Sequence, residues 1–436
     1  MLPNPSSNYE GVFKELFKHP RALSKYKNAF LSPYWGDCLQ SLRLKGYARE
    51  TLMHFLQDNF RFYNFLKHHE VSRLNDITYD HYKHFILSEC RKFKRQHNRM
   101  ISQRQVQGLK FRVRGFLDYA FKNAGLAFEP LKAPPQSRII PDRLLEDYGQ
   151  FCRTHKGLKE TTIRNYLRQL VRLGRLLDKR KATQIKDVTL EDMDAVVWKE
   201  AARLNRRSIR NLISIVRSFF KYLFFQGMIP VNLGDSLVYP RTFQGETRPK
   251  YIPWTDVQRI LASVEQKTAI GKRDFAVLVL MASYGLRCQE AAALKLEDID
   301  WQGKRLILRQ RKGGRMAAFP LTQEVEMALK NYIEGGRSET GYSEVFMTAQ
   351  APIKFMSSSA LSYVVKKHLR KFSPNLPSYG GYILRHSFAK ALLDRGADLP
   401  TIKDLLGHRL IQTTLVYTRI ATEELREVAD NYARFL

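Results

Sequence analysis

Residues 206–225 read RRSIRNLISIVRSFFKYLFF, and this stretch sets the expected architecture of the chain. Its apolar residues recur every three or four positions and share one face: Ile209, Ile213, Val216, Phe220 and Leu223. That period is typical of an amphipathic α-helix with one buried face. We therefore expect a helix over 206–225 within a helical segment.

The end of this helix has an earlier counterpart, because RGFLDYAF (114–121) resembles RSFFKYLF (217–224). Three further pairs lie 111 residues apart: Lys45-Gly46 with Lys156-Gly157, Thr51-Leu52 with Thr162-Ile163, and Asp76-Ile77-Thr78 with Asp187-Val188-Thr189. Four matching blocks in one order indicate an internal duplication. In the second copy, Thr161-Thr162 is a candidate helix cap, and Thr189 with Asp192 is a candidate capping box.

Loops that contain proline bound the two copies and mark the expected domain ends. We expect a weakly structured lead over 1–35 and helical domains over 36–130 and 141–240, followed by a C-terminal domain over 250–436. The C-terminal domain mixes helical stretches (254–264, 274–284, 285–296, 359–372, 380–389 and 401–406) with strands at 305–308 and 317–321, joined by a turn at 311–315. The predicted fold class is mainly α with a small antiparallel β-sheet.

The composition narrows the function classes. The 436 residues carry 73 Lys and Arg against 42 Asp and Glu, a net charge of +31, which favours a polyanionic partner such as nucleic acid. A hydrophobic content of 44% is too high for a disordered basic tail. The longest apolar run, 275–282, is too short to span a membrane, and the N-terminus lacks the pattern of a secretion signal. Four scattered cysteines fit a reducing compartment, so we expect a soluble, cytoplasmic protein.

Two basic runs fall at matching places in the two copies. Residues 91–114 hold nine Lys or Arg and residues 203–221 hold six, and neither run contains an acid. Such runs are usually solvated helix faces, but their repetition favours contact with a phosphate backbone. The candidate DNA-binding residues are Arg91, Lys92, Lys94 and Arg95 in the first run, and Arg206, Arg207 and Arg210 in the second.

Five blocks of the C-terminal segment carry a family resemblance: GLRCQE (285–290), RKGGRMAAFPL (311–321), YILRHSFA (382–389), LLGH (405–408) and TTLVYT (413–418). In order and spacing they resemble the tyrosine recombinases of the phage-integrase type. Residues 141–240 are similar to the helical core-binding domain that precedes the catalytic domain in that family. The resemblance implies two tandem helical DNA-binding domains followed by a mixed α/β catalytic domain. The additional first copy is expected to extend the DNA footprint.

Cleavage of a phosphodiester without a metal ion needs a nucleophile, a proton donor and cations around the phosphorane. Arg287 and Arg385 can each donate two hydrogen bonds to phosphate oxygens. The resemblance makes Tyr417 the nucleophile of a 3′-phosphotyrosine intermediate, Lys312 the proton donor and His408 a phosphate ligand or proton carrier. Glu290, three residues after Arg287, is expected to support that arginine.

Two positions need separate treatment. Tyr382 stands where the family usually has histidine; its hydroxyl can bind phosphate but is a poor base at neutral pH. His386 follows Arg385 directly, so we expect it to face another side of the helix and to be structural. No metal-binding pair of histidines and no nucleotide-binding glycine loop occurs, so no cofactor or metal is expected.

The expected function is site-specific DNA recombination in integration, excision or transposition of a DNA element, with double-stranded DNA as the partner. Leu425, Val428, Tyr432 and Phe435 predict a C-terminal amphipathic helix, and the resemblance implies that it docks on a neighbouring protomer in a tetramer. Two alternatives remain: a DNA-binding protein that has lost catalysis, and a type IB topoisomerase-like relaxing enzyme.

Overall fold

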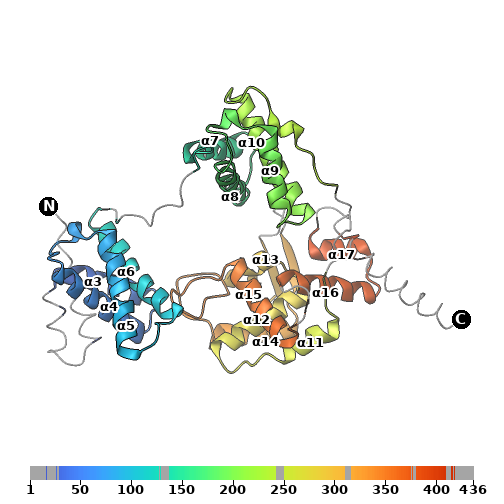
Figure 1. Ribbon diagram of the computed structural model, residues 1–436. Helices are drawn as coiled ribbons and strands as arrows, with labels where there is room; N and C mark the ends of the chain where they lie inside the picture. The colour runs from blue at the N-terminus through green and yellow to red at the C-terminus, as the bar shows by residue number, and fades with distance from the viewer. Residues whose placement is uncertain are drawn as a thin grey trace. The chain divides into compact units, whose positions relative to one another are not determined.

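The structure is a computed structural model that describes residues 16, 26, 29–126, 128, 137–241, 250–309, 316–374, 376, 380–408, 414–415 and 417. The chain divides into two compact units, Met1–Phe128 with Thr247–Leu436, and Glu129–Glu246. The described residues are mainly helical and contain a three-stranded antiparallel sheet (Figure 1), which confirms the predicted fold class. No described helix is both long and apolar enough to cross a membrane.

The first helical segment contains α3 (Ser32–Leu44), α4 (Arg49–His68), the 3₁₀ turn η1 (Leu74–Asp76), α5 (Tyr79–His97) and α6 (Gln103–Asn123). Its core is rich in aromatic rings. The fully buried Trp35 ring lies edge-on to Tyr63 at 5.9 Å and tilted against Phe116 at 6.3 Å. Helix α3 therefore starts inside the lead that was expected to be weakly structured, because Trp35 is needed in this core.

The second helical segment contains α7 (Asp142–Thr154), α8 (Glu160–Leu177), η2 (Ile185–Asp187), α9 (Leu190–Ala201), α10 (Arg206–Phe225) and η3 (Leu233–Ser236). Helix α10 has the predicted bounds, and all five residues of its predicted apolar stripe are buried. The stripe packs in one core with apolar residues of α7, α8 and α9. The prediction of a buried amphipathic helix is confirmed.

The two helical segments share local details as well as helix order. Turns η1 and η2 occupy equivalent places, and each is followed by a threonine that caps the next helix. Thr78 accepts a hydrogen bond from His81 N (3.3 Å), and Thr189 accepts one from Asp192 N (3.2 Å). These features support an internal duplication. The predicted cap at Thr161-Thr162 is wrong, because α8 begins earlier, at Glu160.

The C-terminal segment contains α11 (Trp254–Ala262), α12 (Ala269–Tyr284), α13 (Cys288–Ala292), η4 (Leu296–Asp298), α14 (Gln323–Gly335), α15 (Ser358–Phe372), α16 (Gly381–Asp394) and α17 (Leu399–Leu406). Strands β1 (Ile299–Asp300), β2 (Arg305–Leu308) and β3 (Ala317–Pro320) form the sheet in that order, with Leu306 opposite both Ile299 and Phe319. The apolar run 275–282 lies in α12, which packs against α14, α15 and α16. Its side chains form the centre of this core.

Two sequence-based expectations differ from the structure. The helix expected over 285–296 is wrong: α13 ends at Ala292, and strand β1 was not anticipated. The reason is a distant partner, because the backbone N–H of Leu296 donates to the carbonyl of Ser343 (2.8 Å). The expected turn at 311–315 lies outside the described residues.

Candidate active site

Arg287 stands at the start of α13, where the chain has just left α12. Gly285 ends α12 with φ +59°, a left-handed conformation, and a Cβ there would lie 2.6 Å from Phe388. Only glycine suits that combination, which explains the glycine of the GLR block. The Arg287 N–H and guanidinium both donate to the buried carboxylate of Glu290, at 2.9 and 2.6 Å. Glu290 therefore supports Arg287 as expected.

Arg385 is almost fully buried in α16 and ties two helix ends together. Its Nη1 donates to the carbonyl of Gly285 (2.7 Å) after α12, and its Nη2 donates to the carbonyl of Leu406 (2.6 Å) at the end of α17. Helix C-termini expose unsatisfied carbonyls with partial negative charge, which attract a cation. Glu290 Oε2 lies 3.9 Å from Arg385 Nη1, so one carboxylate serves both arginines.

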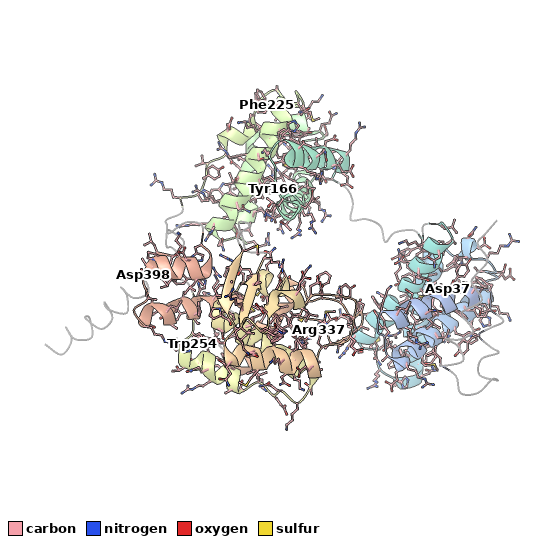
Figure 2. The ribbon with its side chains drawn as sticks, turned by 180° about the vertical axis from the view of Figure 1, so that it is seen from behind. Asp37, Tyr166, Phe225, Trp254, Arg337 and Asp398 are labelled. Carbon is pink, nitrogen blue, oxygen red and sulfur yellow. The ribbon has the colours of Figure 1, made fainter. Side chains whose placement is uncertain are left out.

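His408 is placed by the way in which α17 begins and ends. Asp398, labelled in Figure 2, caps the start of α17 by accepting from Thr401 N (2.9 Å). At the other end, Gly407 (φ +63°) and His408 donate to the carbonyls of Asp404 and Lys403 in a Schellman motif. This motif fixes the path of the chain at the end of α17 and therefore the position of His408.

Two side chains close to His408 complete this part of the site. The Nδ1 atom of His408 lies 2.8 Å from the hydroxyl of buried Thr414, which fixes the orientation of the imidazole. The His408 ring is nearly parallel to that of Tyr417, with centres 6.4 Å apart. His408 and Tyr417, both predicted site residues, therefore lie close together.

Tyr417 is buried, with 1% of its surface exposed, and its hydroxyl lies 2.9 Å from Nδ1 of His386. His386 does face another side of α16 than Arg385, as expected, and on that side it contacts Tyr417. Arg385 and His386 are neighbours on α16, and each contacts a different part of the site. Arg385 bonds to the ends of α12 and α17, and His386 contacts Tyr417. Helical periodicity alone could not reveal this, because it does not say which element packs on each face.

The electrostatics of this contact follow from burial. Burial raises the pKa of Tyr417 to about 12, although Arg385 and Arg287 act in the opposite direction. Burial, together with repulsion from Arg385, lowers the pKa of His386 to about 4, so the imidazole is neutral at pH 7. Both pKa shifts disfavour transfer of the phenol proton to His386, because burial opposes the phenolate and the imidazolium alike. His386 therefore orients Tyr417 and does not act as its base in this state.

The remaining predicted residues are placed less centrally. Tyr382 is 62% exposed, and its ring centre lies 6.1 Å from that of His386, one turn along α16. Lys312 lies outside the described residues. Thr414 and His386 were the site residues that sequence reasoning missed; Thr414 lies in the recognised block TTLVYT, so its spacing from His408 was the available signal.

The predicted DNA-binding residues lie on exposed faces of two helices. Arg91, Lys92, Lys94 and Arg95 are exposed on α5, and Arg206, Arg207 and Arg210 are exposed on the first turns of α10. The Arg210 guanidinium lies over the ring of Tyr239, 5.2 Å from its centre, which limits its freedom. Their contact with DNA stays a prediction.

In chemical terms, the described site gathers a phenol, two guanidiniums and an imidazole from elements far apart in the sequence. The guanidiniums are held by Glu290 and by helix ends, so they are oriented before any ligand arrives. Such preorganised donors suit a phosphate whose charge grows during attack by the phenol oxygen.

Comparisons with known proteins agree with this arrangement. The phage integrase family model matches residues 250–424, and the model of its N-terminal SAM-like domain matches 145–227. The tyrosine recombinase XerD of Listeria innocua is 30% identical over 291 residues, which cover 65% of this chain and 96% of XerD. The tyrosine recombinase XerC of Myxococcus xanthus is 31% identical over 299 residues, covering 66% of this chain and 96% of XerC.

Two solved structures share the fold. The XerH site-specific recombinase, in a post-cleavage complex with a palindromic difH substrate, has a TM-score of 0.51 at 18% identity and covers 69% of this chain and 91% of that one. A λ integrase dimer bound to a COC′ core site has a TM-score of 0.50 at 19% identity, covering 63% and 94%. The XerD and XerC matches, together with the two family models, establish that the chain belongs to the phage-integrase family of tyrosine recombinases.

Proposed function

We propose that this protein is a site-specific DNA recombinase that cuts and rejoins strands through a covalent 3′-phosphotyrosine on Tyr417. One observation carries the proposal: Arg287, Arg385, His408 and Tyr417, spread over 131 residue positions, meet around one buried phenol. A structural ion pair would account for Arg287 with Glu290, but it would not account for the tyrosine and two histidines beside Arg385.

The proposed reaction conserves the phosphodiester bond energy. The Tyr417 oxygen attacks the scissile phosphorus, the phenol passes its proton to His408 or to water, and the bond to the 5′ oxygen breaks. Lys312 gives that leaving oxygen a proton, and Arg287, Arg385 and His408 stabilise the charge on the non-bridging oxygens. Rejoining is the reverse attack by a 5′ hydroxyl of the partner strand, so no nucleotide is consumed.

In the state that the structure describes, Tyr417 is difficult to ionise and is therefore a weak nucleophile. With its pKa at about 12, ionising Tyr417 at pH 7 costs about 7 kcal/mol, against about 4 kcal/mol for an ordinary tyrosine. Arrival of the DNA phosphate is proposed to open the burial around Tyr417 and to let it leave His386. Uncontrolled strand cutting is thereby limited to chains seated on their site.

Double-stranded DNA is the proposed partner. The net charge of +31 and the exposed basic residues at the start of α10 suit a phosphate backbone. The related solved proteins are described as complexes with difH and COC′ DNA. We further propose assembly into a tetramer on two sites through the tail over 418–436, which lies outside the described residues.

The test uses DNA chosen by the protein itself. Duplexes are selected from a random-sequence pool with the full chain, and a nick is placed near the centre of the selected site so that cleavage traps the product. Wild-type protein should give a covalent adduct on a denaturing gel, and Tyr417→Phe should give none. An adduct that survives Tyr417→Phe would contradict the proposal.

The same experiment separates the two rival functions. Selective DNA binding without any adduct would indicate a protein that has lost catalysis. Relaxation of arbitrary supercoiled plasmids, without strand exchange between two selected sites, would indicate a topoisomerase-like enzyme.

A further inference from the structure

The first helical segment contains a groove whose lining includes one candidate DNA-binding residue, Lys92, but not Arg91, Lys94 or Arg95. It lies among α4, α5 and α6 and has a volume of about 770 Å³. Four cationic side chains line it: Arg61 on α4, Lys92 on α5, and Arg104 and Arg112 on α6. Neither family model reaches this part of the chain, because they match residues 145–227 and 250–424.

Two buried carboxylates lie beneath these cations and orient them. Glu89 accepts from Arg61 (2.6 Å) and from Lys92 (3.3 Å), while Asp58 pairs with both Arg61 and Arg112. Both acids are less than 10% exposed, whereas the side chains of Arg61 and Lys92 are 53% and 67% exposed. The acids therefore face the core, and the solvent side of the groove is cationic.

Arg104 is the cation with the least compensation. It is exposed on the first turn of α6, and within the described residues no acid forms an ion pair with it. Four cations against two buried acids leave a net positive groove. Cations that share a groove with too few acids to neutralise them repel one another, and a bound polyanion relieves this repulsion.

The second helical segment contains the same arrangement of two cations on one buried glutamate, at equivalent positions. Arg172 of α8 donates to the buried Glu200 of α9 (2.7 Å), and Arg203, three residues on, donates to the same carboxylate (2.9 Å). The offset of 111 residues relates Arg61, Glu89 and Lys92 to these three residues. The ion-pair triad has thus been kept in both copies.

The grooves of the two copies also coincide. The second copy has a smaller groove of about 360 Å³ lined by Gln169, Leu204, Asn205, Arg207, Ser208, Asn211 and Leu212. With the offset of 103 residues that relates α6 to α10, Arg104 corresponds to Arg207. Arg207 belongs to the segment that matches the SAM-like domain of the integrase family.

We propose that the groove of the first segment is a second DNA-backbone site, which binds duplex phosphates through Lys92 and Arg104. The inference rests on the proposed function, since it assumes that the chain works on DNA. Exposed cations reach the groove from three helices, Arg61 on α4, Lys92 on α5 and Arg104 on α6, so the positive surface is extended, as a strand backbone requires and a single small anion does not.

The test measures how binding to DNA depends on salt. Each lost phosphate contact makes the slope of log K against log salt less negative by about 0.9, so Lys92→Gln with Arg104→Gln should make it less negative by about 2. Lys122→Gln, an exposed change on α6 outside the groove, is the matched control and should leave the slope unchanged. Arg104→Lys keeps the charge and should restore most of one contact.

A hydroxyl-radical footprint on the selected duplex supplies a second measurement. The double variant should lose protection over an outer stretch and keep protection of the central site. A slope and a footprint equal to those of Lys122→Gln would overturn the proposal. Because Lys92 and Arg104 are exposed, circular dichroism should show that the double variant keeps its fold. Arg104→Glu places an acid in the groove, and a salt slope equal to that of Lys122→Gln in this variant would also overturn the proposal.

Adduct formation keeps this proposal separate from the proposed function. At saturating protein the Lys122→Gln control should form the Tyr417 adduct as the wild-type protein does. If wild-type protein forms no adduct at all, the recombinase function fails, but the salt slopes still decide whether this groove binds DNA.

Discussion

The buried state of Tyr417 predicts how this residue reacts with a reagent that attacks phenolates. Tetranitromethane nitrates ionised tyrosine, so its rate reports the ionised fraction. At pH 8 a phenol of pKa about 10 is ionised in about 1 molecule in 100, and one of pKa about 12 in about 1 in 10,000. Tyr417 in the folded chain should therefore be nitrated about 100-fold more slowly than an ordinary tyrosine, before any steric shielding.

The assay is peptide mass spectrometry after brief nitration at several pH values. Trypsin releases residues 410–419, LIQTTLVYTR, in which Tyr417 is the one tyrosine. The same chain unfolded in urea is the matched reference, because it has the same peptide without the burial. The folded rate should rise about tenfold per pH unit up to pH 10 and beyond, since the group is far from half ionised.

Addition of the selected DNA gives the second arm of this experiment. A phosphate that draws Tyr417 away from His386 and toward the arginines should speed its nitration in a Lys312→Ala background, provided that cleavage is blocked there. The reasoning would be refuted if Tyr417 in the free folded chain were nitrated as fast as in urea. In that case the burial and the 2.9 Å contact with His386 would not describe the resting protein.

Three further predictions concern positioning and stability. Thr414→Val removes the hydroxyl that orients His408, and should slow adduct formation by about tenfold without changing the melting temperature by more than a few degrees. His386→Asn, whose amide can reach the place of Nδ1, should retain more adduct formation than His386→Ala. Neither variant should change the shape of the pH–rate profile between pH 6 and 8, since burial lowers the pKa of His386 to about 4 and it is neutral over that range. Burial disfavours the charge of Asp274, but hydrogen bonds from His368, Arg273 and Lys367 outweigh burial and lower its pKa to about 2. The charged carboxylate therefore stabilises the fold fully above about pH 4, and about 2 kcal/mol of that stability is lost as the pH falls to about 2. Hydrogen exchange of α12 should show this loss in the wild-type protein and not in Asp274→Asn.

The parts of the fold that local patterns control were predictable from the sequence. Helix α10 has its predicted bounds because an unbroken apolar stripe and the cap at Asn205 act within one stretch of chain. The end of α13 was not predictable in this way. Leu296 leaves the helix to bond with Ser343, and nothing local to 293–296 indicates a partner so far along the chain.

The same distinction explains the site. Arg287, Arg385, His408 and Tyr417 were identified because each lies in a recognisable block, and the structure brings them together. The contact between His386 and Tyr417 was missed because it depends on how Tyr417 packs against α16, an element far from it in the sequence. Sequence spacing describes one element at a time, whereas this contact belongs to two.

Arg385 shows why the fold and the site cannot be separated in this family member. Its two hydrogen bonds to Gly285 and Leu406 bring together the end of α12, from which Arg287 emerges, and the end of α17, from which His408 emerges. One buried guanidinium therefore sets the spacing of Arg287 and His408, the other two proposed phosphate ligands. A lysine could keep the charge but could not span both carbonyls in a fixed plane. Loss of activity in Arg385→Lys would thus arise partly from misplaced Arg287 and His408, and a wild-type adduct rate in that variant would show that this tie between helix ends is not needed.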